Sequence, residues 1–346
     1  MNNPHVLREE ILKLKAQRQA LILAHYYEDA AIQDLADHVG DSLALAQWGA
    51  RSENQIVLLA GVTFMAESVK LLSPEKTVLA PDLNAGCSLV ENSPYEKVLA
   101  WRLQNPQALM VTYVNSSAHV KAITDVCVTS SNAEKVLAAI PRDREILFGP
   151  DQNLGRYLMK KLNRHMQLWA GNCDVHLLFS ARRLEQLRAR HPEARVLAHP
   201  ECNEGILRQS DVIGSTSRLL QEVRENRSVQ KFIIATELGI FHQMRLARPE
   251  AELIQSPPEG SCACAECPYM KLNTLEKLRN SLCDLAPQVD VPPEVAQHAR
   301  QSLERMMRIT DGETVQWPER FVDPKLPAEP PYRAERGLIP RFAPEV

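Results

Sequence analysis

Three of the chain's eight cysteines lie within six residues of one another, in the sequence SCACAECPYM at residues 261–270. This stretch could form a local zinc knuckle, a redox pair, or one corner of a metal site whose other ligands lie far away in the sequence. A zinc knuckle needs a second pair of ligands at short range, and the only later cysteine, Cys283, stands alone in a helical pattern. A local zinc site is therefore disfavoured, and other parts of the chain must supply the remaining ligands.

Chemically useful residues recur about every 86 positions along the chain. Three polar or aromatic triplets follow apolar segments, at residues 25–27, 113–115 and 199–201. A hydroxyl residue follows the first residue of each triplet by 17 positions: Ser42, Ser130 and Thr216. Each unit closes on a loop with one cysteine: Cys87, Cys173 and Cys267. This register selects Cys267, rather than Cys262 or Cys264, as the metal ligand in the cysteine-rich stretch.

The elements between these residues predict the fold. In each unit an amphipathic helix precedes an apolar strand, as in VLREEILKLKAQRQ before ALILA, and two further strands follow with a helix between them. This alternation predicts an α/β architecture of parallel sheets covered by helices. Right-handed crossovers place the strand ends on one edge of each sheet, where ligands of open α/β sheets bind. Three homologous repeats most simply pack around a pseudo-threefold axis, with one shared centre; a linear array with separate sites is the alternative.

The repeat also predicts how the chain is divided. We expect α/β repeats at residues 1–92, 93–175 and 176–270, closing C-terminal helices at 271–310, and a Pro-rich extension at 311–346. The extension holds seven prolines, which is typical of an extended surface arm or a disordered tail. Its sequence assigns it no role.

Three convergent thiolates without a fourth favour an iron–sulfur cluster over structural zinc. A [4Fe–4S] cluster held by three cysteines has one open iron, which can bind a substrate oxygen as a Lewis acid. We interpret Cys127, Cys202 and Cys283 as packing residues. A disulfide between Cys264 and Cys267 could form under oxidation and remove Cys267 from the cluster, but this is a weaker alternative because a three-residue separation alone is common.

The hydroxyls and triplets suggest what such a cluster would act on. Ser42, Ser130 and the pair Ser215 and Thr216 each precede an apolar periodic run, so we expect them to cap helix N-termini. Three N-termini aimed at one centre would bind a small, multiply charged anion, such as a dicarboxylate or a phosphate ester. In the triplets, histidines and a partly desolvated Glu201 can transfer protons, and tyrosine hydroxyls can donate to oxyanions. Asn115 offers an amide to a carboxylate.

Composition narrows the class of protein. The formal net charge is -3 and no basic run indicates nucleic-acid binding. No stretch approaches the roughly 18 continuous apolar residues of a membrane span, and the N-terminal sequence has no apolar region typical of a signal peptide. We therefore expect a cytoplasmic protein with reduced thiols and with no nucleic-acid or membrane partner.

Over residues 5–310 the sequence resembles the quinolinate synthase family. The resemblance depends on an ordered series of motifs: AHYYEDAAIQDLADHVGDSLALA, LSPEKTVLAPDLNAGCSL, YVNSSAHVKA, VTSSNA, GPDQNLGRY, the W-x-G-x-C-x-V-H box at residues 169–176, HPE, IGSTS and CPYMKLNTLE. It implies a triangular fold of three α/β repeats around one [4Fe–4S] cluster held by Cys87, Cys173 and Cys267. It also implies condensation of iminosuccinate with dihydroxyacetone phosphate to quinolinate, with release of phosphate and two waters, in NAD biosynthesis.

The resemblance also implies roles for individual residues. Substrate would be held by His25, Ser42, Tyr113, Asn115, Ser130, Ser215 and Thr216. Proton transfers would fall to Tyr27, His199 and Glu201, and the open iron would bind and expel a substrate hydroxyl as water. An aspartate oxidase or dehydrogenase is the expected source of the labile iminosuccinate.

The sequence departs from the family pattern at three places. Cys262 is displaced from the usual cysteine spacing, Leu238 stands where relatives often have a basic residue, and the chain continues past residue 310. Two other functions compete with the enzyme: an iron or oxygen sensor that uses the same cluster without turnover, and a zinc-stabilised scaffold.

Overall fold

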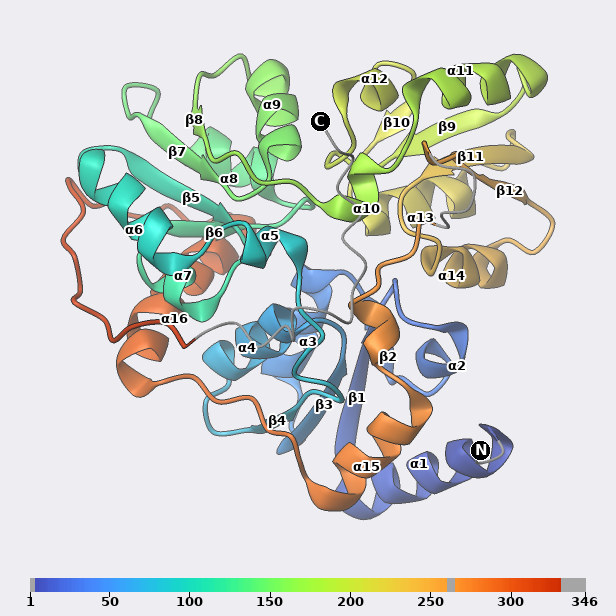
Figure 1. Ribbon diagram of the computed structural model, residues 1–346, viewed down its shortest axis with the longest axis horizontal. Coiled ribbons are helices and arrows are strands. Elements are labelled where there is room, and N and C mark those ends of the chain that lie inside the picture. The colour runs from blue at the N-terminus through green and yellow to red at the C-terminus, as the bar shows by residue number, and fades with distance from the viewer. Residues whose placement is uncertain (1–3, 260–264, 331–346) are drawn as a thin grey trace.

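Three parallel four-stranded sheets surround a common centre in the computed structural model, which describes residues 4–259 and 265–330. Figure 1 shows the first sheet in blue at the bottom, the second in teal to green at the upper left and the third in yellow-green to orange at the upper right. The sheets have the corresponding strand orders β2-β1-β3-β4, β6-β5-β7-β8 and β10-β9-β11-β12. The predicted α/β fold of three similar units is confirmed, whereas the exact boundaries between units stay a prediction.

The elements follow one another in the same order in each unit. The first contains α1 (Pro4–Arg18), β1 (Ala20–His25), α2 (Ala30–Gln33), β2 (His38–Gly40), α3 (Ser42–Arg51), β3 (Ile56–Ala60), α4 (Thr63–Leu72), β4 (Thr77–Leu79) and α5 (Ser88–Glu91). The second contains α6 (Tyr95–Gln104), β5 (Leu109–Tyr113), α7 (Ala118–Ala122), β6 (Val126–Val128), α8 (Ala133–Ala139), β7 (Ile146–Gly149), α9 (Gln152–Leu162), β8 (Gln167–Leu168) and α10 (Asp174–Leu177). The third contains α11 (Ala181–Arg190), β9 (Arg195–Ala198), α12 (Glu204–Leu207), β10 (Val212–Ile213), α13 (Thr216–Glu225), β11 (Lys231–Ala235), α14 (Ile240–Ala247) and β12 (Glu252–Gln255). The chain then forms the 3-10 turn η1 (Met270–Leu272), α15 (Leu275–Asp284) and α16 (Pro293–Thr310).

Each sheet has one more strand than the sequence predicted. The additional strands β2, β6 and β10 are only three, three and two residues long, and each precedes the repeated hydroxyl. Each pairs in parallel with the first strand of its unit. Segments this short carry little periodicity, so the sequence gives almost no signal for them.

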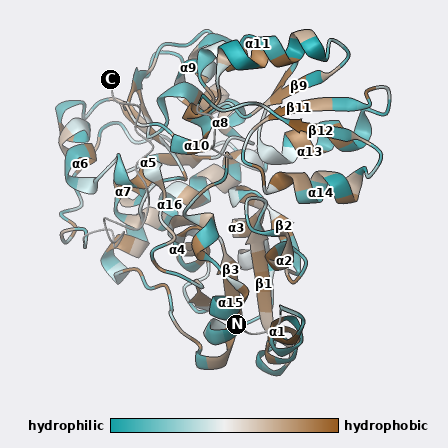
Figure 2. Cartoon of the chain, turned by 45° about the vertical axis from the view of Figure 1, so that its right-hand side comes forward, coloured by the Kyte–Doolittle hydropathy of each residue, from teal (hydrophilic) through white to brown (hydrophobic). Residues whose placement is uncertain are grey.

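The core lies between the sheets and their covering helices. Residues of β1 and β5 are buried throughout, as expected for central strands of parallel sheets. Figure 2 shows hydrophobic strands inside and hydrophilic helix faces outside. The largest core cluster joins the first two units and includes α16, which packs against α4, α7 and β6. The closing helix α15 packs instead against α1. The fold therefore rigidly joins strands far apart in the sequence.

An aspartate is repeated in all three units in the same structural place. The Oδ2 atoms of Asp37, Asp125 and Asp211 accept the backbone N–H of Ile22, Met110 and Val196, at 2.8, 2.7 and 2.7 Å. Each aspartate also pairs with a basic residue of the helix before the first strand: Lys15, Arg102 and Arg188. This contact fixes that helix against the sheet in every unit.

Only the second copy of this contact is deeply buried, because the side chains of Arg102 and Asp125 are 0% and 10% exposed. Asp125→Ala would leave a buried guanidinium without its carboxylate, so we expect it to lower the free energy of unfolding by about 3–5 kcal/mol. Asp211→Ala, whose partner is partly exposed, should cost about 1–2 kcal/mol. Urea titration of both variants measures the difference. Equal losses would show that burial does not set the strength of the contact.

None of the helices in the described residues is both long and apolar enough to cross a membrane.

Candidate functional site

A cavity lies where the three units meet. Twelve of the thirteen residues predicted for the site line it: His25, Tyr27, Ser42, Cys87, Tyr113, Asn115, Ser130, Cys173, His199, Glu201, Thr216 and Cys267. The thirteenth, Ser215, is not among the residues that line the cavity. It is the N-cap of α13, and its side chain accepts a hydrogen bond from the N–H of Arg218. The structure therefore brings together residues from three units that are up to 242 positions apart, from His25 to Cys267.

The three cysteines that line this cavity have equivalent surroundings. Cys87 and Cys173 are the N-cap residues of α5 and α10, and Cys267 lies just before η1. Backbone N–H groups of the following turn donate to each sulfur. Cys262 and Cys264, whose redox role the sequence left open, lie outside the described residues.

The chemistry of this donor set suits a metal. Burial raises the pKa of all three thiols, to about 12 for Cys267, and the neighbouring thiols add to the shift for Cys87 and Cys173. Neutral thiols in such a place lose their protons when a soft metal binds them. No Lys or Arg lines the cavity in the described part of the chain, so a bound metal would be the natural source of the compensating charge. The residues fit an iron–sulfur cluster better than a hard cation such as Mg²⁺.

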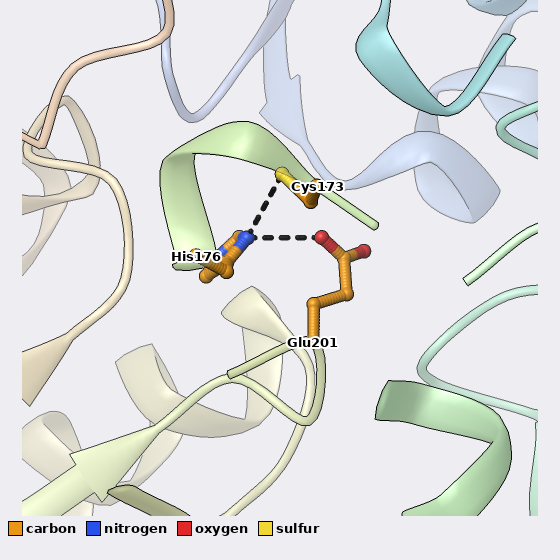
Figure 3. A group of neighbouring side chains, drawn as sticks. All are labelled: Cys173, His176 and Glu201. Atoms are coloured by element: carbon orange, nitrogen blue, oxygen red, sulfur yellow. Dashed lines mark hydrogen bonds and ion pairs between the residues drawn. The ribbon is translucent and has the colours of Figure 1, made fainter. Parts of the chain in front are cut away.

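Cys173 lies beside a histidine and a carboxylate, and Figure 3 shows that His176 contacts both Cys173 and Glu201. His176 Nδ1 lies 3.2 Å from Cys173 Sγ and 2.9 Å from Glu201 Oε2. The ligand atoms of all three residues lie within 4.8 Å of one another, so this group could also contribute to a single metal site. Because His176 is already hydrogen-bonded to both neighbours, it is well placed to orient Cys173 and Glu201.

The other ring nitrogen of His176, Nε2, begins a chain of hydrogen bonds that leads to Tyr27. His176 Nε2 lies 3.0 Å from Thr236 Oγ1, which in turn lies 2.8 Å from the hydroxyl of Tyr27. Burial raises the pKa of Tyr27 well above its ordinary value, so the phenol keeps its proton. The chain therefore orients a neutral donor into the cavity and connects it to an imidazole and Glu201.

The pKa of the Glu201 carboxyl is lowered, so this group is ionised in the cavity. Burial alone would raise its pKa, but interactions with His199 and His176, together with a hydrogen bond from Tyr113, lower it below the usual range. Burial and the charge of Glu201 raise the pKa of nearby Asp151 well above its ordinary value. Glu201 is therefore the ionised acceptor of the cavity, whereas burial opposes ionisation of Asp151.

Both cavity histidines predicted from the sequence are neutral imidazoles. Burial lowers the pKa of His25 to about 4 and that of His199 to about 3, even though Glu201 favours the charged forms. His199 Nε2 lies 3.3 Å from Ser130 Oγ, and the ring of His25 packs edge-on against Tyr27. Each can accept a proton or, once a bound anion raises its pKa, donate one.

The predicted helix caps are correct only for Ser215. The cap of α3 is Asp41, whose Oδ1 accepts the N–H of Ala44 at 3.0 Å, and Ser42 is the first residue of that helix. Thr216 is likewise the first residue of α13. Ser130 lies in a turn before α8, whose N-cap position is held by Asn132. The hydroxyls are therefore offset from the caps, which leaves Ser42, Ser130 and Thr216 facing the cavity.

Asp41 also joins the three units. Its Oδ2 accepts hydrogen bonds from Ser131 Oγ of the second unit at 2.8 Å and from Ser217 Oγ of the third at 2.7 Å. Each of these serines directly follows a cavity hydroxyl, Ser130 or Thr216. One carboxylate thus fixes the spacing of the cavity hydroxyls.

Sequence reasoning missed Asp41, His176 and Thr236. Only His176 had a usable signal, since it lies three residues after Cys173 on the same helical turn and ends the W-x-G-x-C-x-V-H box. The other two act through contacts between units, which the spacing of residues does not reveal.

Two buried carboxyls support the Cys267 loop. Glu237 accepts the N–H of Cys267 at 3.0 Å and that of Gly239 at 2.6 Å. Glu28 accepts Asn273 Nδ2 at 2.7 Å, which joins the first unit to the segment after Cys267. Leu238, the departure noted in the sequence, packs against the apolar cluster of the third unit.

The fold and the cavity define a class of α/β protein in which three repeated units share one centre lined by cysteines, hydroxyl groups, histidines and carboxyl groups. Residues 9–308 match the family described as "Quinolinate synthetase A protein", and the chain belongs to this family. It is 46% identical over 308 residues to a Synechococcus protein named quinolinate synthase, covering 89% of this chain and 96% of the relative. Proteins of the same name from Trichodesmium erythraeum and Prochlorococcus marinus are 44% and 47% identical; the matches cover 89% and 88% of this chain, and 95% and 91% of the relatives.

Glu28 generates a pH-dependent contribution to stability. Burial raises its pKa to about 8, against the hydrogen bond from Asn273 and the charge of Lys271. The folded protein thus retains a proton that the unfolded chain releases, so wild-type stability falls as pH rises from about 5 through about 8. Glu28→Gln cannot ionise, and we expect its Tm relative to wild type to increase as pH rises from about 5 through about 8.

Calorimetry under anaerobic conditions measures this difference, with the exposed Glu75→Gln as the matched control. A Tm difference for Glu28→Gln that stays constant with pH would contradict the raised pKa.

Proposed function

We propose that the protein is a quinolinate synthase of NAD biosynthesis. It would condense iminosuccinate with dihydroxyacetone phosphate to quinolinate and release phosphate and two waters. The observation that carries the proposal is the convergence of Cys87, Cys173 and Cys267, one from each unit, on a cavity that also holds Tyr27 and Glu201. Membership of the family and the names of the relatives support it.

We assign a [4Fe–4S] cluster to the three cysteines. Three soft sulfur donors line the cavity without a fourth cysteine among its described lining residues, which matches a cluster with one iron open to substrate. When bound, the cluster would supply a Lewis acid that assists the loss of a substrate hydroxyl as water. The hydrogen bond from His176 would orient Cys173 toward it.

The anionic substrates would be bound mainly by neutral donors. Ser42, Ser130 and Thr216 offer hydroxyls, Asn115 an amide, and Tyr113 a phenol that burial keeps protonated by raising its pKa. Ser215 would contribute by capping α13 rather than by contact. A dianion near His25 would raise the pKa of that imidazole and turn it into a charged donor.

Proton transfers would use the groups around Glu201. Glu201, ionised and only 3% exposed, would accept a proton from substrate carbon, as a base in a dehydration must. His199, neutral and adjacent, would relay it. Tyr27, held by Thr236 and His176, would donate to a developing oxyanion. Because these groups lie so close, they titrate as a set.

The same reasoning extends to partners and location. Iminosuccinate hydrolyses readily, so an aspartate oxidase or dehydrogenase close by would supply it, and a buried site would protect it once bound. We propose a cytoplasmic location, where thiols stay reduced, and neither a nucleic-acid nor a membrane partner.

Anaerobic turnover with both substrates tests the function directly, read as quinolinate formed. We expect the wild type to be active and Glu201→Gln to lose activity by about 10²–10⁴-fold while it keeps its iron, because the amide preserves the shape but cannot accept the proton.

The matched control is Glu204→Gln, an exposed glutamate three residues later, which should leave turnover unchanged. A wild type that holds its cluster without turnover would favour the sensor instead. Normal turnover in Glu201→Gln would remove Glu201 from the mechanism.

A further inference from the structure

Residues 311–330, called here the C-terminal strap, run beyond the family match that ends at residue 308. The strap contains neither helix nor strand and follows the outside of the second unit beside α6, where Figure 1 shows it in red. Trp317 and Leu326 pack against the largest core cluster, and Phe321 lies 4.7 Å under the guanidinium of Arg102. The N–H of Phe321 also donates to the carbonyl of Pro106 at 2.7 Å. These contacts attach the strap firmly to the second unit.

The strap ends by placing one carboxylate among polar groups of that unit. Glu329 has a side chain only 14% exposed, and its Oε2 accepts the N–H of Tyr95, at the start of α6, at 3.1 Å. Ser117 donates a hydrogen bond to the same carboxylate, and Lys121 contributes its positive charge. Such a partly buried acid with specific donors differs from the solvated charges of an ordinary surface tail.

Two of the groups that meet Glu329, Ser117 and Lys121, belong to the segment that follows Asn115. Ser117 is the N-cap of α7 and accepts the N–H of Val120 at 3.3 Å. Lys121, in the same helix, is fully buried and donates to the carbonyl of Ser116. The strap therefore contacts a turn that begins directly after a cavity residue.

A second carboxylate approaches this turn from the first unit. Glu67 Oε2 accepts the N–H of Ala118 at 3.0 Å, and its charge acts on Lys121, as does that of Glu329. The start of α7 is thus held between a carboxylate from the first unit and one from the strap. Asn115 Oδ1, two residues before the cap, is buried and has no hydrogen-bond partner within the described residues, so this oxygen does not anchor the side chain, whose position depends on its backbone; its amide N–H groups are the ones that can donate to a carboxylate.

We propose that Glu329 is a positioning residue: by docking on the start of α7 it holds the turn at residues 115–117 so that the Asn115 amide faces a carboxylate of the bound substrate. The inference rests on the proposed function, in which Asn115 binds substrate. It gives the strap a role in ligand affinity, exerted from outside the cavity. Residues that react with the substrate lie on other segments, so the strap should affect binding far more than the chemical step.

Steady-state kinetics and ligand binding of the reconstituted enzyme test this role. With Glu329→Ala we expect the KM for iminosuccinate and the Kd for quinolinate, used as a stable dicarboxylate probe, to rise about fivefold, as expected for about one lost hydrogen bond. The kcat should stay within about twofold of wild type. Glu329→Gln, which still accepts the Tyr95 N–H, should recover part of the affinity.

Two controls separate positioning from general stability. Glu319→Ala changes an exposed glutamate of the same strap, and a chain ending at residue 330 keeps Glu329; both should behave as wild type. In hydrogen exchange, the backbone amides of residues 115–122 should exchange about tenfold faster in Glu329→Ala than in the wild type. The amides of β9 should exchange at an unchanged rate.

A lower Tm for Glu329→Ala with unchanged KM, Kd and exchange at residues 115–122 would overturn the inference, since Glu329 would then only stabilise the fold. Absent turnover in the wild type would instead contradict the proposed function. In that case the exchange measurement still decides whether Glu329 holds the turn, and unchanged exchange would end the inference.

Discussion

The carboxylate of Asp41 is the contact on which the arrangement of the cavity depends. It caps α3 in its own unit and accepts hydrogen bonds from serine hydroxyls of the other two, so the three separate sheets are tied together beside the hydroxyls that line the cavity. Hydrophobic packing can bring sheets together, but it is not directional. Hydrogen bonds to one buried carboxylate are directional and favour one relative placement. The strand ends that carry His25, Tyr113 and His199 then have fixed separations.

Burial gives the cavity its chemical character. Desolvation keeps His25, His199, Tyr27 and the thiols in their neutral forms, while local donors keep Glu201 ionised. A charge placed in such a site is costly unless it is paired. Because no Lys or Arg is among the described residues that line the cavity, a metal is favoured as the partner of the cysteine thiolates. The same low dielectric would strengthen the pull of an iron or imidazole on a developing negative charge. Stability and function therefore depend on the same burial.

The sequence was informative wherever one sheet sets the position of a residue. The triplets follow strands, and the cysteines lie 62, 60 and 68 residues after the first residue of each triplet. Strands of parallel sheets end at a common edge, and the structure accordingly places Tyr113 and Cys173 at the same cavity as His25. The helix caps were less predictable, because Asp41 and Ser42 are neighbours that both suit a helix start, and only the contacts of the folded chain decide between them.

What the sequence could not predict depends on contacts between units. Thr236, in the third unit, connects Tyr27 of the first unit to His176 of α10, and no periodicity marks it. The short strands β2, β6 and β10 form because β1, β5 and β9 are already in place beside them. The strap has a proline-rich composition typical of extended chain, and its docking through Phe321 and Glu329 became visible only in three dimensions.

The central claim is that one cysteine from each unit holds a shared iron–sulfur cluster. Iron and acid-labile sulfide analysis of anaerobically reconstituted Cys87→Ala, Cys173→Ala and Cys267→Ala, with the exposed Cys283→Ala as control, tests it most directly. We predict about four irons and four sulfides per chain in the wild type and the control, and loss of the intact cluster in each of the other three variants. A full cluster in any one of those three, or a single zinc ion in the wild type, would contradict the account.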